Sequence, residues 1–215
     1  MKTLKFYYLL VALAFLSCSN EEDICYSCDE NIDAWVKEKR DSFENITYSQ
    51  FLEYDGDKQR AIFRSLSATK KKDLWLDRMT DLKTAFTSKK DIEIINFVEN
   101  ILLNELTYSD LFTDELYLNY EKQIVNLAKE ANWSRVQVVL SFSSFNSIYE
   151  NKSLDDDPAI VDAGPDLGQG QDCHCKWGYF SCMGDNKCDK KSKCEETESG
   201  CGLLWLQDCN GYCNS

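Results

Sequence analysis

The residues most capable of chemistry in this chain are its eleven cysteines. Cys18 follows an apolar run near the amino terminus, Cys25 and Cys28 form a C-x-x-C, and eight more lie in the last forty-three residues. A cysteine can be acylated, can bind a metal as its thiolate, or can form a disulfide. His174 is the only histidine, which excludes a Ser-His-Asp or Cys-His arrangement elsewhere in the chain. We therefore do not expect an enzyme.

The amino terminus has the pattern of an export signal. Two lysines precede an apolar run, Phe6 to Leu16, which is shorter than the roughly 20 residues that a bilayer-spanning helix needs. The run ends in Phe15-Leu16-Ser17-Cys18, which resembles the lipobox cut by lipoprotein signal peptidase, with Phe15 where Leu is preferred. The alternative is an ordinary signal peptide followed by an incidental cysteine. We expect residues 1–17 to be the signal peptide and Cys18 to carry the lipid that holds the protein to a membrane.

Residues 18–30 are expected to form an acidic tether. The run Ser19-Asn20-Glu21-Glu22-Asp23 resembles a signal that moves lipoproteins to the surface of some Gram-negative bacteria, although it also suits a solvated spacer. Export places the chain in an oxidising compartment, where disulfides persist. Cys25 and Cys28 are therefore expected to close a short structural loop, since a thioredoxin-like site needs a βαβ context. The expected location is the outer membrane or the cell surface.

Residues 31–150 are predicted to form a helical domain. This range contains one glycine, Gly56, and no proline, the two residues that most often interrupt helices. We predict a bundle of five or six helices. The segments 33–43 and 49–66 are expected to be helical, and further helices are expected to begin near residues 67, 88, 113 and 134, the last reaching about residue 149.

Caps and apolar stripes support these helices. Ser88 with Asp91 and Ser134 with Gln137 fit the spacing of a capping box. Apolar stripes at helical spacing are expected to face the core, and they comprise Trp75, Met79, Leu82 and Phe86 in one helix and Leu116, Tyr120, Leu127 and Ala131 in another. The domain contains no cysteine, no histidine and no carboxylate pair that spacing marks as catalytic, so it is interpreted as a scaffold or a binding surface.

A linker and a cysteine-rich domain follow the helices. Residues 151–172 hold both prolines and a Gly/Gln-rich run, a composition typical of a linker. Residues 173–215 are too few to bury a sufficient core without disulfides. Their cysteines are Cys173, Cys175, Cys182, Cys188, Cys194, Cys201, Cys209 and Cys213. The pairing cannot be deduced from eight cysteines. Zinc is the alternative, but only the C-x-C at Cys173 suits a ligand pair, so we expect no metal and no cofactor.

The intervals in Cys173-x-Cys175-x6-Cys182-x5-Cys188-x5-Cys194-x6-Cys201 are similar to the cysteine frame of the bacteriocin fulvocin C-related proteins. The resemblance extends to Thr197–Gly202, to Trp205 and to Cys209-Asn210-Gly211, whereas the last two cysteines are spaced differently. It implies a small antibacterial domain at residues 173–215. The fold class expected overall is mostly α, with a linker leading to a disulfide-rich, irregular or β domain.

The function expected from these features is that of a lipid-anchored, bacteriocin-like surface protein whose terminal domain acts on the envelope of neighbouring cells. Candidate binding residues of that domain are Trp177, Tyr179, Phe180, Trp205 and Tyr212, although the tryptophans could instead pack on the disulfides. The alternative is a surface module that binds a host protein or polysaccharide. The net charge of −13 excludes nucleic acid as a partner, because such a partner requires a basic face.

Overall fold

The computed structural model describes residues 24–27, 29–145, 174–175, 190–191, 197–210 and 212–213, and among those after residue 145 it describes the side chains of 200 and 202–207. The described part is mostly helical, as predicted. Its seven α-helices are α2 (Glu30–Phe43), α3 (Tyr48–Leu52), α4 (Gly56–Ser65), α5 (Ala68–Ala85), α6 (Lys89–Leu103), α7 (Asp114–Glu130) and α8 (Arg135–Phe142). A short 3-10 helix, η2 (Leu203–Trp205), follows in the carboxyl-terminal part.

The helices begin where side-chain caps are available. The hydroxyls of Ser67, Ser88, Thr113 and Ser134 accept hydrogen bonds from backbone N–H groups in the first turns of α5, α6, α7 and α8. The capping boxes predicted at Ser88 and Ser134 are both present, which confirms these two starts. The predicted 49–66 helix is instead two helices, because Asp55 caps a new helix that begins at Gly56.

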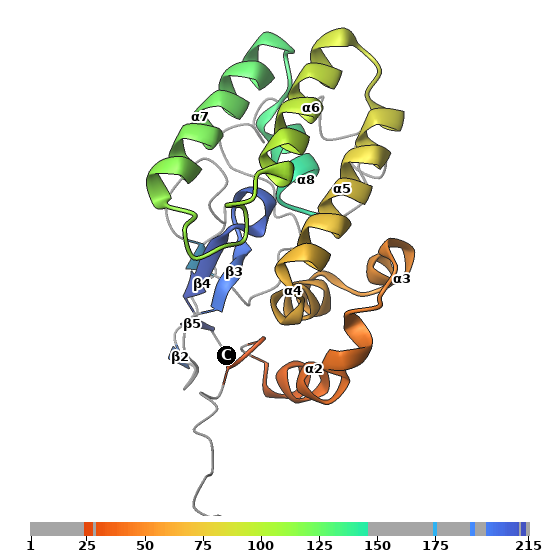
Figure 1. The fold of residues 1–215 in the computed structure, drawn as a ribbon, viewed down its shortest axis with the longest axis vertical. Helices are drawn as coiled ribbons and strands as arrows, with labels where there is room; N and C mark the ends of the chain where they lie inside the picture. Colours follow the sequence, from red (N-terminus) through yellow and green to blue (C-terminus); the bar gives the residue numbers. More distant parts are fainter. Residues whose placement is uncertain are drawn as a thin grey trace, which may run out of the picture.

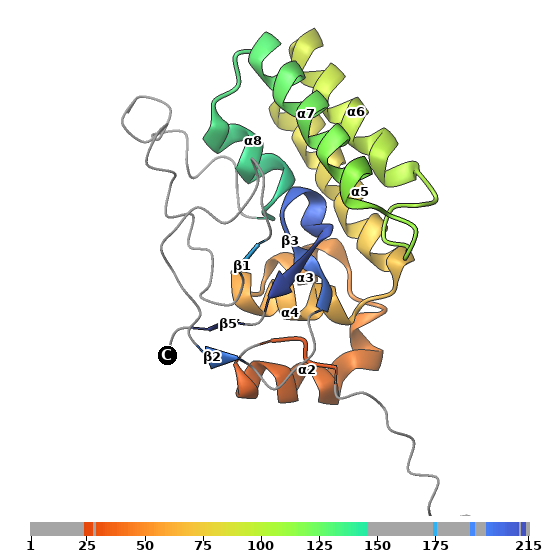
Figure 2. The same cartoon turned by 90° about the vertical axis from the view of Figure 1, so that its left-hand side faces the viewer.

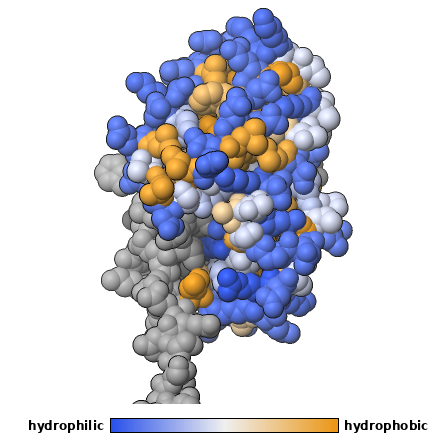
Figure 3. Space-filling model, in the orientation of Figure 1, coloured by the Kyte–Doolittle hydropathy of each residue, from blue (hydrophilic) through white to orange (hydrophobic). Residues whose placement is uncertain are grey.

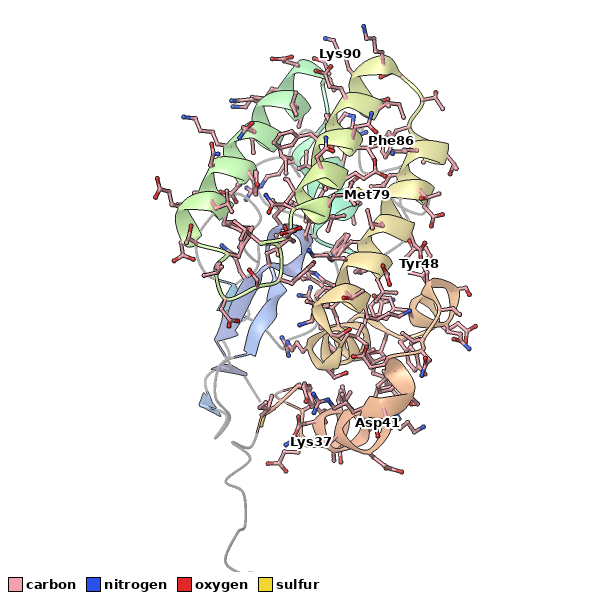
Figure 4. The ribbon with its side chains drawn as sticks, viewed as in Figure 1. Lys37, Asp41, Tyr48, Met79, Phe86 and Lys90 are labelled. Atoms are coloured by element: carbon pink, nitrogen blue, oxygen red, sulfur yellow. The ribbon has the colours of Figure 1, made fainter. Side chains whose placement is uncertain are left out.

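The helices form two groups around one hydrophobic core. Figure 1 shows α5, α6 and α7 side by side in the upper part of the molecule, with α2, α3 and α4 below them. Within these groups α5 packs against α6, α6 against α7, and α2 against α4. The largest fully buried side chains include Phe51, Phe63, Trp75, Met79 and Phe142, and Figure 4 places Met79 on α5 within the bundle.

The carboxyl-terminal residues contribute short strands. They are β1 (His174–Cys175), β2 (Lys190–Lys191), β3 (Thr197–Cys201), β4 (Gln207–Asn210) and β5 (Tyr212–Cys213). One sheet has the order β1-β4-β3 and the other pairs β2 with β5, with antiparallel partners throughout. Figure 2 shows β3 above α4, and the turn that follows β3 lies between α8 on one side and α5 and α7 on the other.

Two predicted details of the helices are wrong. The last helix ends at Phe142 rather than near residue 149, because the backbone of Ser143 leaves the helical region, with φ −133°. The buried face of α7 consists of Tyr117, Glu121, Ile124 and Ala128, one position away from the predicted stripe. Tyr120, Leu127 and Ala131 of that stripe are only partly buried. Tyr117 and Ser143, which lie at these two places, both bond to the carboxyl-terminal residues.

The surface in the orientation of Figure 1 is largely hydrophilic, with a few apolar patches (Figure 3). The large exposed apolar side chains of the bundle include Leu103, Leu111 and Leu118. None of the helices in the described ranges combines the length and apolar character required to cross a membrane.

Candidate functional site: the seat of the Gly200–Leu206 segment

The segment between β3 and β4 enters the core of the helical part. Leu203, Leu204 and Trp205 are 0%, 0% and 2% exposed and belong to the same hydrophobic cluster as the helices. We call these three residues the buried turn. The side chains of the helical part that contact it are called the seat, and the seat consists of Arg60, Phe63, Trp75, Tyr108, Tyr117, Ser143 and Phe145.

The backbone of the buried turn is strained. Leu204 and Trp205 both have φ of +52°, a left-handed conformation that costs about 1–2 kcal/mol for a residue with a Cβ. Gly202 precedes them with φ of +70°, and a Cβ at this position would lie 2.6 Å from the hydroxyl of Tyr117. Burial of each leucine contributes about 1.5–3 kcal/mol, so packing in the seat can hold the turn in this conformation.

Hydrogen bonds from the seat satisfy the polar atoms of the buried turn. The backbone N–H of Leu203 donates to the hydroxyl of Tyr117 at 3.0 Å, and the hydroxyl of Tyr108 donates to the carbonyl of Leu204. The indole Nε1–H of Trp205 donates to the carbonyl of Ser143 at 2.9 Å. A buried polar group without a partner costs about 1–3 kcal/mol, so these bonds specify how the turn sits.

An aromatic cluster encloses the indole of Trp205. Its ring centroid lies 5.0 Å from that of Phe63, 5.1 Å from Phe145 and 5.9 Å from Trp75, all in edge-to-face arrangements. The guanidinium of Arg60 lies 5.2 Å from the centroid of the same ring, a cation–π geometry. Phe145 reaches this cluster because the chain leaves α8 after Phe142. The end of α8 at Phe142 therefore allows Phe145 to contact Trp205 in the seat.

Three buried arginines tie distant segments to the helices. Arg60 donates to the carbonyl of Gly200 at 2.9 Å, Arg64 to the carbonyl of Tyr26 at 2.8 Å, and Arg78 to the carbonyl of Leu140 at 2.9 Å. Their exposed fractions are 4–8%, and each guanidinium keeps a bond to a backbone oxygen, as a buried charge requires. Arg60 and Arg64 stand one turn apart on α4, so this helix binds both the amino-terminal and the carboxyl-terminal segments.

Burial in the seat keeps the hydroxyl of Tyr108 in its neutral form. Burial raises the pKa of Tyr108 well above its ordinary value of 10, so the hydroxyl keeps the proton that it donates to Leu204. Groups of three or more His, Cys, Asp or Glu placed to hold a metal are absent from the described residues. The arrangement of the seat can therefore hold a peptide segment.

The structure settles the placement of one candidate binding residue. Trp205 is a candidate binding residue for which burial is the alternative, and the structure shows it buried, with its indole enclosed by the helical part. The domain boundary predicted at residue 173 also does not separate the buried turn from the helices, because both belong to one hydrophobic cluster. Local patterns missed this contact, since Leu203 and Tyr117 lie 86 residues apart.

The other predicted site residues are placed only in part. Cys25 is disulfide-bonded, and its predicted pairing with Cys28 stays a prediction because Cys28 lies outside the described residues. Cys175, Cys201, Cys209, Cys213, His174 and Tyr212 lie in strands of which the backbone is described, and the register makes Cys175 the cross-strand partner of Cys209. The residues outside the described ranges are Cys18, Cys28, Cys173, Cys182, Cys188, Cys194, Trp177, Tyr179 and Phe180.

Comparisons of the chain with protein-family models, with curated proteins and with solved structures found no match. The seat is thus described by its own geometry alone. A signal for it does exist in the sequence. Leu203-Leu204-Trp205-Leu206 is an apolar run within a polar, cysteine-rich region. Such a run predicts burial, but it does not say against which element.

Proposed function

We propose that the chain is an exported, lipid-anchored surface protein in which the helical part holds and presents a bacteriocin-like, cysteine-rich segment to neighbouring bacterial cells. The observation that carries this proposal is the insertion of the buried turn into the seat, with Trp205 bonded to Ser143 and enclosed by three aromatic rings. The lipobox-like Cys18 supplies the anchor, and the cysteine frame supplies the resemblance to fulvocin C-related proteins.

The seat gives the helical part a role as a holder. A linker alone would leave residues 173–215 able to move independently of the helices. The buried turn instead fixes the turn end of the β3–β4 hairpin on α4 and the aromatic cluster. The cysteine-rich segment is therefore presented from a defined position, and it stays attached even when the linker is cut.

Retention of the cut segment can be tested directly. A protease site placed in residues 151–172 of the full chain is cleaved with the disulfides intact, and the product is passed over a size-exclusion column in native buffer. We expect both pieces to elute together, because the seat buries the turn. Reducing and non-reducing gels then show whether Cys25 also links the pieces covalently. Separation of the pieces in native buffer would contradict the proposed holding role.

The antibacterial part of the proposal needs a co-culture. Cells that display the protein are mixed with a labelled related strain that lacks it, and surviving neighbours are counted. Cys18→Ala removes the anchor and Trp205→Ala loosens the segment, while Leu111→Ala alters an exposed side chain as the control. The proposal expects killing or envelope binding that requires Cys18. The proposal is refuted if the displayed wild-type chain neither kills neighbouring cells nor binds their envelope.

The alternative is a surface module that binds a host protein or polysaccharide without harming cells. The burial of Trp205 favours this alternative, because a buried indole is not available to contact a target membrane. The same co-culture separates the two functions: neighbours that survive and to whose envelope the chain does not bind support the module, whereas loss of neighbours or binding to their envelope supports the bacteriocin-like activity.

A further inference from the structure

A groove runs between α6 and α7, away from the seat. Its volume is about 770 Å³, within the range of pockets that bind small molecules. The lining residues are Lys89, Ile92, Glu93, Asn96, Phe97, Asn100, Gln123, Asn126 and Leu127. The two helices lie side by side in both ribbon views (Figures 1 and 2). None of the described residues of the cysteine-rich segment lines the groove, so a ligand bound here is a function separate from that of the seat.

Amide side chains form most of the polar lining. Asn96 and Asn100 are one turn apart on α6, and Gln123 and Asn126 share a face of α7, so four amides converge from two helices. Asn96, Asn100 and Asn126 are exposed, and within the described part of the chain their amides bond to no other residue. Asn is a weaker helix former than Lys or Glu, which normally cover a solvated helix face. The helices thus carry amides where stability alone would favour other residues.

The charge of the groove differs from that of the protein. The chain has a net charge of −13, yet the groove holds only Lys89 and Glu93, whose charges cancel. An ionic ligand would require an excess of the opposite charge. Each amide instead offers one acceptor and two donor positions, which matches hydroxyl groups that both donate and accept. The ligand that fits is neutral and rich in hydroxyls.

Apolar side chains provide the remaining lining. Phe97, Ile92 and Leu127 are partly buried, and the ring of Phe97 packs 6.3 Å from that of Tyr120. An amphipathic helix would need a continuous apolar strip in such a groove, and here the apolar side chains alternate with amides. Alternating polar and apolar positions suit a sugar ring, which has hydroxyls at its edge and C–H groups on its face.

Contacts at both ends of the groove join the two helices. The ammonium of Lys90, labelled at the top of Figure 4, donates to the carbonyl of Glu130 at 2.6 Å and joins the start of α6 to the end of α7. The indole of Trp133 donates to Asp91 at 2.9 Å near the same end. At the opposite end, the amide of Asn104 donates to the hydroxyl of Tyr120 at 3.2 Å. A groove that is already formed binds a ligand without the free-energy cost of a rearrangement.

From this geometry we infer that the α6–α7 groove binds a neutral oligosaccharide, with the amides of Asn96, Asn100, Gln123 and Asn126 bonding sugar hydroxyls and Phe97 contacting a ring face. The groove runs from Lys89 to Asn100 along α6, about 16 Å at 1.5 Å per residue, so it accommodates more than one sugar unit. The structure does not favour a charged polysaccharide or a peptide.

The test is calorimetric titration of the purified full chain with four neutral probes: cellohexaose, maltohexaose, mannohexaose and xylohexaose. At least one is expected to bind at one site per chain. The double variant Asn96→Ala, Asn126→Ala should raise its Kd about ten-fold, which corresponds to about 1.4 kcal/mol. Asn119→Ala is the matched control, since Asn119 is an exposed asparagine of α7 outside the groove lining. Its Kd should not change.

Thermal unfolding of each variant shows that the fold is retained, and Ala in place of an exposed helical Asn should not lower the melting temperature. The inference is overturned if none of the four hexasaccharides binds at millimolar concentration, or if the double variant binds as tightly as the wild type. Binding of only a charged probe, such as a hyaluronan hexasaccharide, would also overturn it. These outcomes are independent of the co-culture, because the groove lies outside the seat.

Discussion

Replacement of Trp205 by Ala tests whether the cysteine-rich segment and the helices share one core. The indole is 2% exposed, contacts Phe63, Trp75 and Phe145, and donates to the carbonyl of Ser143. Truncation of a buried Trp to Ala generally costs about 3–5 kcal/mol. We expect a loss near the middle of this range, about 4 kcal/mol, because the cavity is lined by rigid rings.

Urea unfolding of the full chain with intact disulfides measures this loss through the helical circular dichroism at 222 nm. With a slope of about 2 kcal/mol per M, the midpoint should fall by about 2 M. The melting temperature should fall by roughly 8–16 °C. The decisive point is that the signal comes from the helices, whereas the substitution lies in the segment after β3.

Two further variants serve as comparisons for the stability loss of Trp205→Ala. Trp205→Phe keeps a ring but removes the indole N–H, which leaves the carbonyl of Ser143 without this donor and should cost about 1–3 kcal/mol. Leu111→Ala removes a side chain that is 70% exposed and should change stability by less than about 0.5 kcal/mol. If Trp205→Ala left the helical transition within that same margin, the turn would not be part of the helical core, and the reasoning would be refuted.

Three other changes test single features. Gly202→Ala should destabilise the chain by about 1–3 kcal/mol, because a Cβ meets the hydroxyl of Tyr117 at a φ of +70°. Gly56→Ala, in the first turn of α4, should instead be neutral or stabilising by up to about 1 kcal/mol, and thermal unfolding compares the two. Ser88→Ala removes the capping box of α6 and should cost about 1 kcal/mol in the same assay. Burial raises the pKa of Tyr48 from 10.0 to about 12, although the charge of Arg78 opposes the shift. The unfolded chain therefore loses its phenolic proton first, so the free energy of unfolding should stay level below pH 10 and fall between about pH 10 and 12. Tyr48→Phe should reduce that fall when unfolding is measured by urea at several pH values, and an identical fall in the variant would contradict the assignment.

The local features of the helical part could be predicted from the sequence. Ser67, Ser88, Thr113 and Ser134 marked helix starts because capping depends on residues within one turn of each other. The absence of proline and the scarcity of glycine indicated that this part of the chain is mostly helical, and the described residues up to 145 confirm it. The division into α3 and α4 was missed, although Asp55-Gly56 at the junction is a capping signal, and so were the end of α8 and the buried face of α7.

The seat could not be predicted, because its parts are joined by packing rather than by spacing. The buried face of α7 is set by Tyr117, whose hydroxyl accepts from Leu203, and no pattern within α7 reveals that partner. Trp205 lies among cysteines, and this neighbourhood favoured an independent disulfide-stapled domain. The amide groove was missed for a related reason, since Asn residues on α6 and α7 form a pattern only when both helices are aligned.

The placement of Arg60 and Arg64 one turn apart on α4 has a mechanical consequence. When the chain is pulled at residue 24 and at residue 200, the first side-chain bonds between these segments and the helices to come under tension are those from Arg64 to Tyr26 and from Arg60 to Gly200. Force between the two ends then passes through a single helical turn and largely bypasses α5, α6 and α7. A shear in the surrounding flow would strain α4 before it distorted the rest of the bundle, and the groove between α6 and α7 would keep its shape.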